Sequence, residues 1–232
     1  MSTGDTIEQP QKQFIGIAVL FILCFFISKT NLLALYISLG LDRETYSFAL
    51  QIAFINIVFV VLYPFLSRQT LTQLGLRSPS LWSSDEKRFF LIGLVISNGC
   101  FLLLTSKWQR LLAFDDLLQI TLMVLIPMLF WGFFQEMVYR GLLQNQLSKK
   151  VGSTKAILIS NLLFTFGPLH FHHYQYVADN IAHMKYFAFI FVMGLFFAWV
   201  YKRFNNLWLA GLFHGIGNVY LDSINTATAL FG

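Results

Sequence analysis

Long apolar runs separated by short polar segments set the pattern of hydrophobic and polar positions along this chain. An α-helix needs about 20 predominantly apolar residues to cross the hydrocarbon core of a bilayer, and the runs approach that length. The pattern predicts an all-α fold, a polytopic transmembrane helical bundle of seven spans, or of eight if polar residues such as Asp222 break the last run. The predicted helices are residues 14–36, 46–66, 89–105, 117–147, 156–170, 185–201 and 206–227.

Composition strengthens this interpretation. Hydrophobic residues make up 56% of the 232 positions and charged residues 12%, whereas soluble domains average about 25% charged residues. The chain is therefore predicted to be an integral membrane protein that lies in the lipid bilayer. No stretch between the apolar runs is long enough for a soluble module, so residues 1–232 are predicted to form a single domain with a polar amino-terminal segment at 1–13.

Lysine and arginine residues between the predicted spans indicate an orientation. Ten fall on one side of the membrane and four on the other, which places residues 1–13 in the cytoplasm and, for seven spans, the carboxyl terminus outside. We expect the plasma membrane of a bacterium or archaeon. Topology thus explains the net charge of +5 without a nucleic-acid partner. The ten are Lys12, Arg68, Arg77, Lys87, Arg88, Lys149, Lys150, Lys155, Lys202 and Arg203; the four are Arg43, Lys107, Arg110 and Lys185.

Three short polar motifs interrupt the apolar helices predicted in the second half of the chain. Ionisable residues within a membrane span are costly and by default mark function. The motifs fall at similar predicted depths, so their side chains are expected to share one layer of the bundle. They read Gln135-Glu136-x-x-x-Arg140, Phe166-x-x-x-His170 and His214-x-x-x-Asn218.

In their order and spacing these motifs resemble those of the CPBP or Abi family, the CAAX-protease and bacteriocin-processing intramembrane proteases. The resemblance covers residues 117–227, whereas the first three predicted helices match only in hydropathy. It implies an endopeptidase that hydrolyses a peptide bond in a membrane-associated peptide or protein substrate that is membrane-anchored, prenylated or leader-bearing.

The resemblance also implies roles for individual residues. Glu136 with His170 would activate water, and His214 with Asn218 would hold the oxyanion. Arg140 would fix a carboxylate through a bidentate contact. Each of these polar residues also has a structural interpretation, as an ion pair, a helix cap or an interhelical hydrogen bond.

Gln135 departs from the family pattern, which has two adjacent glutamates. A glutamine side chain cannot take up a proton at neutral pH, and Glu136 points about 100° away around the helix. Three accounts stay open: a natural variant that uses Glu136 and His170, a catalytically silent relative, or an engineered substitution. Gln135 and Phe166 are treated as supporting residues, and Phe166 is expected to pack.

A non-catalytic alternative is a membrane scaffold or immunity-type binding protein that keeps the fold. It predicts a dry or plugged cavity with Gln135 bonded to His170, whereas the protease predicts a water-filled cavity. A separation of more than about 8 Å between Glu136 and both histidines, beyond single-water reach, would rule out the assigned catalysis.

Metal chemistry is a further alternative within the enzyme class. No cofactor is required by the motifs, but Glu136, His170 and His214 would supply three ligands to a divalent metal such as zinc, with an open position for water. His172, His173 and His183 form a second histidine-rich stretch. That stretch lacks the zinc-protease spacing patterns, so it is not expected to bind metal.

Overall fold

The computed structural model of this protein is built from helices. No described residue lies in a strand, so the predicted all-α class is confirmed. The structure describes residues 5–29, 43–104, 107–114, 116–170, 174, 181 and 184–221.

The predicted apolar segments that the structure describes are all helical. Three of these helices are long and apolar enough to cross a membrane, over Ala49–Ser67, Leu117–Val151 and Met184–Phe204, and two shorter apolar ones cover Ile15–Ile27 and Leu207–Leu221. These helices support an integral membrane protein, while the count of seven or eight spans stays a prediction. The main elements are α1 (Asp5–Lys29), α3 (Arg43–Ser67), α5 (Ser84–Leu104), α9 (Ser153–Phe166), α11 (Met184–Phe204) and α12 (Leu207–Leu221).

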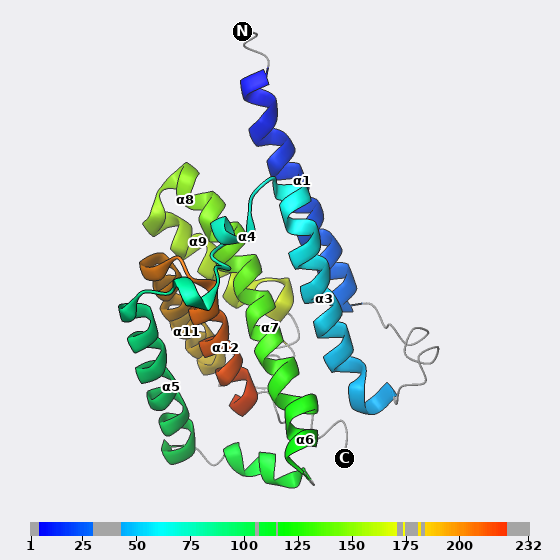
Figure 1. Cartoon of the computed structure of the whole chain (residues 1–232), viewed down its shortest axis with the longest axis vertical. Helices are drawn as coiled ribbons and strands as arrows, with labels where there is room; N and C mark the ends of the chain where they lie inside the picture. The colour runs from blue at the N-terminus through cyan, green and yellow to red at the C-terminus, as the bar shows by residue number, and fades with distance from the viewer. Residues whose placement is uncertain are drawn as a thin grey trace.

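One long helix crosses the centre of the bundle and carries the first polar motif. Two π-helical stretches, η3 and η4, interrupt it on either side of α7. Such widened turns occur frequently at functional sites. Figure 1 shows α7 between α3 and α12, against both of which it packs. In chain order the segments are α6 (Leu117–Ile120), η3 (Thr121–Leu125), α7 (Ile126–Glu136), η4 (Met137–Gln144) and α8 (Asn145–Val151).

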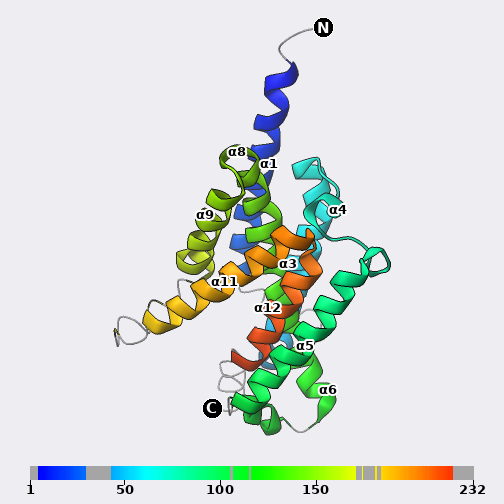
Figure 2. The same ribbon diagram turned by 90° about the vertical axis from the view of Figure 1, so that its left-hand side faces the viewer.

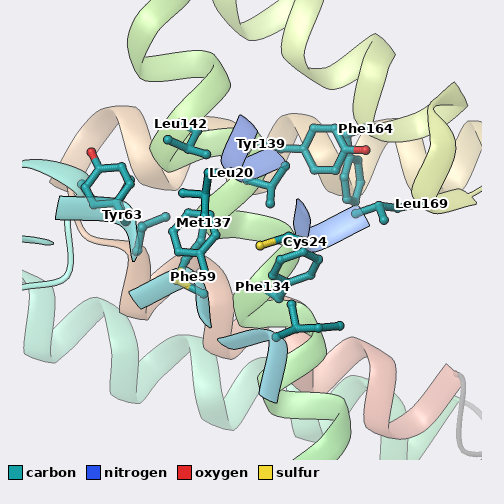
Figure 3. Close-up of a cluster of buried hydrophobic side chains, with 14 of the residues drawn as sticks. Leu20, Cys24, Phe59, Tyr63, Phe134, Met137, Tyr139, Leu142, Phe164 and Leu169 are labelled. Atoms are coloured by element: carbon teal, nitrogen blue, oxygen red, sulfur yellow. The ribbon is translucent and has the colours of Figure 1, made fainter. Parts of the chain in front are cut away.

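Hydrophobic packing anchors this long helix. Leu20 of α1, Phe59 of α3 and Phe134 of α7 belong to one buried cluster that extends to Phe164 of α9 (Figure 3). A second cluster, around Phe213, joins α11 and α12 to α5. The polar motifs therefore lie in helices that apolar contacts hold in place.

Glycines bring α7 and α12 close together. A Cβ atom added at Gly132 would lie 2.5 Å from the backbone nitrogen of Gly215, and one added at Gly215 would lie 2.6 Å from the Cα of Leu129. Small residues at such crossings let membrane helices approach backbone to backbone. Because Gly132 lies one turn before Glu136 and Gly215 follows His214, this crossing sets the distance between those two side chains.

Replacing Gly215 with alanine is therefore expected to destabilise the protein by about 1–3 kcal/mol, the usual cost of overpacking. The matched control is Gly217→Ala on the same helix, where an added Cβ meets nothing within 4 Å. Alanine is the better helix former, so the control should be neutral or slightly stabilising. Unfolding of the purified variants in detergent checks both; equal stabilities would contradict a backbone-limited crossing.

A polar cluster ties the start of α5 to the turn between α11 and α12. The buried carboxylate of Glu86 accepts hydrogen bonds from Asn206 Nδ2 and from the backbone N–H of Ser83, each at 2.8 Å, and forms an ion pair with Arg77. The backbone N–H of Leu207 also donates to the carbonyl of Gly75 at 3.1 Å. These contacts fix where α12, which carries the third motif, begins.

Acid is expected to weaken this cluster. Burial raises the pKa of Glu86, but hydrogen bonds from Asn206 and Ser83 and the charge of Arg77 together lower it below its ordinary 4.5. The ionised carboxylate therefore contributes its full stabilisation at pH values above 4.5, the ordinary pKa. The contribution is lost as the pH falls through the lowered pKa of the folded protein. Glu86→Gln should flatten the acid limb of a stability-against-pH curve, whereas replacing its exposed neighbour in Asp85→Asn should leave the limb in place.

Candidate active site

A cavity of about 340 Å³ lies among α5, α7, α11 and α12. Four residues predicted from the sequence line it: Gln135, His170, His214 and Asn218. The other predicted residues, Glu136, Arg140 and Phe166, are not among the lining residues. Most of the wall is aromatic or aliphatic and includes Phe89, Phe101, Trp131, Tyr186, Phe189 and Phe213.

Glu136 and His214 form a buried carboxylate–imidazole pair across the α7–α12 crossing. Glu136 is fully buried, and its Oε1 lies 2.8 Å from Nδ1 of His214. Glu136 also forms an ion pair with Arg140, so we take its carboxylate as the acceptor and Nδ1 of His214 as the donor. The imidazole stacks on Phe197, with ring centroids 4.7 Å apart, and meets the ring of Phe164 edge-on. These contacts fix both the tautomer and the plane of the ring.

Arg140 lies behind this pair. Its Nε is 3.2 Å from Oε2 of Glu136, and both side chains are fully buried. The expected bidentate contact is not formed, because Nη2 donates to the carbonyl of Gly194 at 2.9 Å. The guanidinium also lies 4.8 Å from the centroid of the Phe164 ring. Arg140 therefore neutralises the carboxylate and joins the long helix to α11.

His170 reaches the cavity from η5 (Pro168–His170), a short 3₁₀ turn. Helix α9 ends at Phe166, four residues before the predicted end at 170, because Pro168 cannot continue the helix. Nδ1 of His170 lies 2.5 Å from the carbonyl oxygen of Phe164, so this nitrogen carries the proton. The amide nitrogen of Gln135 lies 3.3 Å from Nε2 of His170 and donates to its lone pair.

Asn218 completes the polar lining. It lies one turn after His214 on α12 and is buried. Its amide nitrogen has no hydrogen-bond partner among the residues that the structure describes. An unpaired buried donor costs about 1–3 kcal/mol, and because Asn218 lines the cavity, its amide is a candidate donor to a ligand oxygen.

The structure brings the three motifs together but pairs them differently from the expectation. Glu136 lies 2.8 Å from His214, well within the limit of about 8 Å set for the assigned catalysis. The cavity-lining partner of His170 is Gln135 and not Glu136. Phe166 stacks on Phe187 of α11, which fits packing. The Gln135–His170 pair was expected for the non-catalytic alternative, whereas the Glu136–His214 pair was not predicted, because it depends on how α7 and α12 are rotated about their own axes.

Sequence reasoning missed the support for Arg140. Asn161 of α9 accepts from Arg140 at 3.5 Å and donates to the carbonyl of Phe191 at 2.9 Å. A Cβ atom at Gly194 would lie 2.1 Å from the side-chain oxygen of Asn161. A lone asparagine inside an apolar helix was the available signal.

The proposed metal ligands do not converge. Across the described part of the chain, no three His, Cys, Asp or Glu side chains come together, and Glu136, His170 and His214 are all described. His172, His173, His183 and Asp222 lie outside the described residues. The geometry of the described residues thus does not fit the zinc ligand set named as an alternative.

The bundle, its buried polar motifs and its largely apolar cavity are features of intramembrane proteases. Comparison with protein families identifies a match over residues 117–220, to the family described as type II CAAX prenyl endopeptidase Rce1-like. The match includes all three motifs and confirms the predicted family resemblance. No curated protein and no solved structure was found to match the chain.

Proposed function

We propose that this chain is an intramembrane endopeptidase that hydrolyses a peptide bond in a membrane-anchored substrate. The observation that carries the proposal is the cavity in which Gln135, His170, His214 and Asn218 meet inside an apolar bundle. Two imidazoles and two amides supply a base and hydrogen-bond donors, which amide hydrolysis requires. The matched family, described as a prenyl endopeptidase, supports a substrate that bears a prenyl or similar apolar chain.

The openness of the cavity toward lipid supports a membrane-anchored substrate. Two lining residues, Ile96 of α5 and Phe189 of α11, are 59% and 44% exposed. At the opposite end of α11, Phe89 of α5 closes the gap by contacting Trp199 and Phe204. Figure 2 shows that the amino-terminal end of α11 lies farther from α5 than its carboxyl-terminal end does. An apolar chain would enter sideways from the bilayer between these helices.

Narrowing the cavity tests the proposal. Gly217 lines the cavity and an added Cβ there meets nothing within 4 Å, so Gly217→Leu fills space without forcing the backbone. The matched control is Gly99→Leu on α5, where an added Cβ is equally unobstructed but Gly99 does not line the cavity. In proteoliposomes, cleavage of a farnesylated carboxyl-terminal peptide should fall at least tenfold in Gly217→Leu and stay unchanged in Gly99→Leu. Equal rates would contradict use of the cavity.

A second candidate function is a catalytically silent binding protein. The observation that favours it is the hydrogen bond between Gln135 and Nε2 of His170. The glutamine amide that occupies this nitrogen cannot accept a proton, as a glutamate at position 135 would. Such a protein would hold an apolar chain in the same cavity. It would bind the farnesylated peptide without cutting it and would gain cleavage on Gln135→Glu.

A further inference from the structure

His214 has one ring nitrogen committed to a buried carboxylate. Nδ1 donates to Glu136, so a neutral His214 carries its proton there and leaves Nε2 with a lone pair. Because His214 also lines the cavity, this lone pair is the polar function it can offer to a bound molecule. A neutral ring in this tautomer has no second N–H for an oxyanion.

The groups packed around His214 hold its ring with Nδ1 toward Glu136. The described charged and titratable groups facing it are Glu136 and Arg140 from the long helix, with Tyr139 beside them and His170 across Phe164. Glu136 is already neutralised by Arg140 at 3.2 Å. Arg140 therefore supplies the countercharge of Glu136, and the Nδ1–Glu136 hydrogen bond leaves Nε2 as the ring nitrogen that can meet a bound molecule.

We propose that His214 is the general base of this protein, with Glu136 as its positioning residue, and that Asn218 and Gln135 are the oxyanion donors. This assignment rests on the proposed protease function. The assignment differs from the roles that the family resemblance implies. There, His170 with a glutamate activates water and His214 helps to hold the oxyanion. It also removes the need for a carboxylate at position 135.

The reaction balances with these groups alone. Nε2 of His214 takes a proton from water as the water oxygen bonds to the scissile carbonyl carbon, and the carbonyl π electrons move onto oxygen. Asn218 Nδ2 and the second N–H of Gln135 donate to that oxyanion. As the C–N bond breaks, the imidazolium returns the proton to the leaving amine, and a carboxylic acid and an amine result. Between these steps the oxyanion balances the charge of the imidazolium, and Glu136 holds Nδ1–H of His214 in place.

The protonation state of His214 is a direct test that needs no substrate. We would record ¹⁵N spectra of histidine-labelled protein in nanodiscs at pH 7 and assign His214 from the His214→Gln variant. The expected result is a protonated Nδ1 and an unprotonated Nε2. Glu136→Gln should shift the Nδ1–H signal upfield, while Tyr139→Phe, which removes a neighbouring buried hydroxyl, should leave it in place. A protonated Nε2 in the unmodified protein would overturn the base assignment.

Kinetics separate this inference from the proposed function. Glu136→Gln is expected to lower kcat by about 10²–10⁴-fold with little change in KM. Cleavage by the unmodified chain with no loss in Glu136→Gln overturns the base assignment and leaves the protease intact. Cleavage that appears only in Gln135→Glu overturns both.

Discussion

Replacing Arg140 with methionine is expected to lower the free energy of unfolding by about 3–5 kcal/mol, the cost of leaving one member of a buried ion pair uncompensated. Arg140 and Glu136 are both fully buried, and the guanidinium also bonds the carbonyl of Gly194. Its loss would strand an anion inside the bundle. Denaturant unfolding in detergent micelles measures the change.

Two further variants separate this effect from lost packing. Arg203→Met removes an exposed arginine that lies over Trp199, and should cost about 1 kcal/mol or less. The double variant Glu136→Gln with Arg140→Met should recover part of the loss, because no charge is then stranded. A double variant no more stable than Arg140→Met would contradict the electrostatic explanation.

Replacing His214 with glutamine is expected to reduce cleavage by about 10²–10⁴-fold, the usual contribution of a general base. Glutamine keeps a polar side chain next to Glu136 but cannot take a proton from water. The measurement is single-turnover cleavage of a farnesylated peptide in proteoliposomes, since it reports the chemical step without product release.

The comparison variants are His170→Gln and Cys100→Ser. His170→Gln should cause a smaller loss, because in this account His170 orients Gln135. Cys100 is exposed on α5 and does not line the cavity, so Cys100→Ser should cleave at the unmodified rate. A larger loss of cleavage in His170→Gln than in His214→Gln would identify His170 as the general base.

Much of the helical framework was predictable because apolar run length and proline position act locally. The end of α9 at Phe166 follows from Pro168, and the long helix ends at Val151 because Gly152 adopts a φ of 81°. The beginning of α1 at Asp5 was missed, since a helix can continue beyond its apolar run into polar residues. The two π-helical stretches of the long helix also left no pattern in the sequence.

The sequence places the three motifs at one depth but does not determine how the helices that carry them are rotated. Depth along each helix placed the motifs in one layer, and the structure brings His214 to Glu136 within that layer. Rotation of the helices decided which groups meet, and it depends on the contact between Gly132 and Gly215. Contacts between distant segments of this kind cannot be derived from the spacing of one helix.

The most direct test of the account compares the unmodified chain with Gln135→Glu in one cleavage assay. Both proteins, with His214→Ala as the blank, would be reconstituted at equal density with a panel of farnesylated and transmembrane peptides. We expect the unmodified chain to cleave, His214→Ala not to cleave, and Gln135→Glu to be slower because it places an anion beside the oxyanion. Cleavage by Gln135→Glu alone would contradict this expectation and show that the chain as given is catalytically silent.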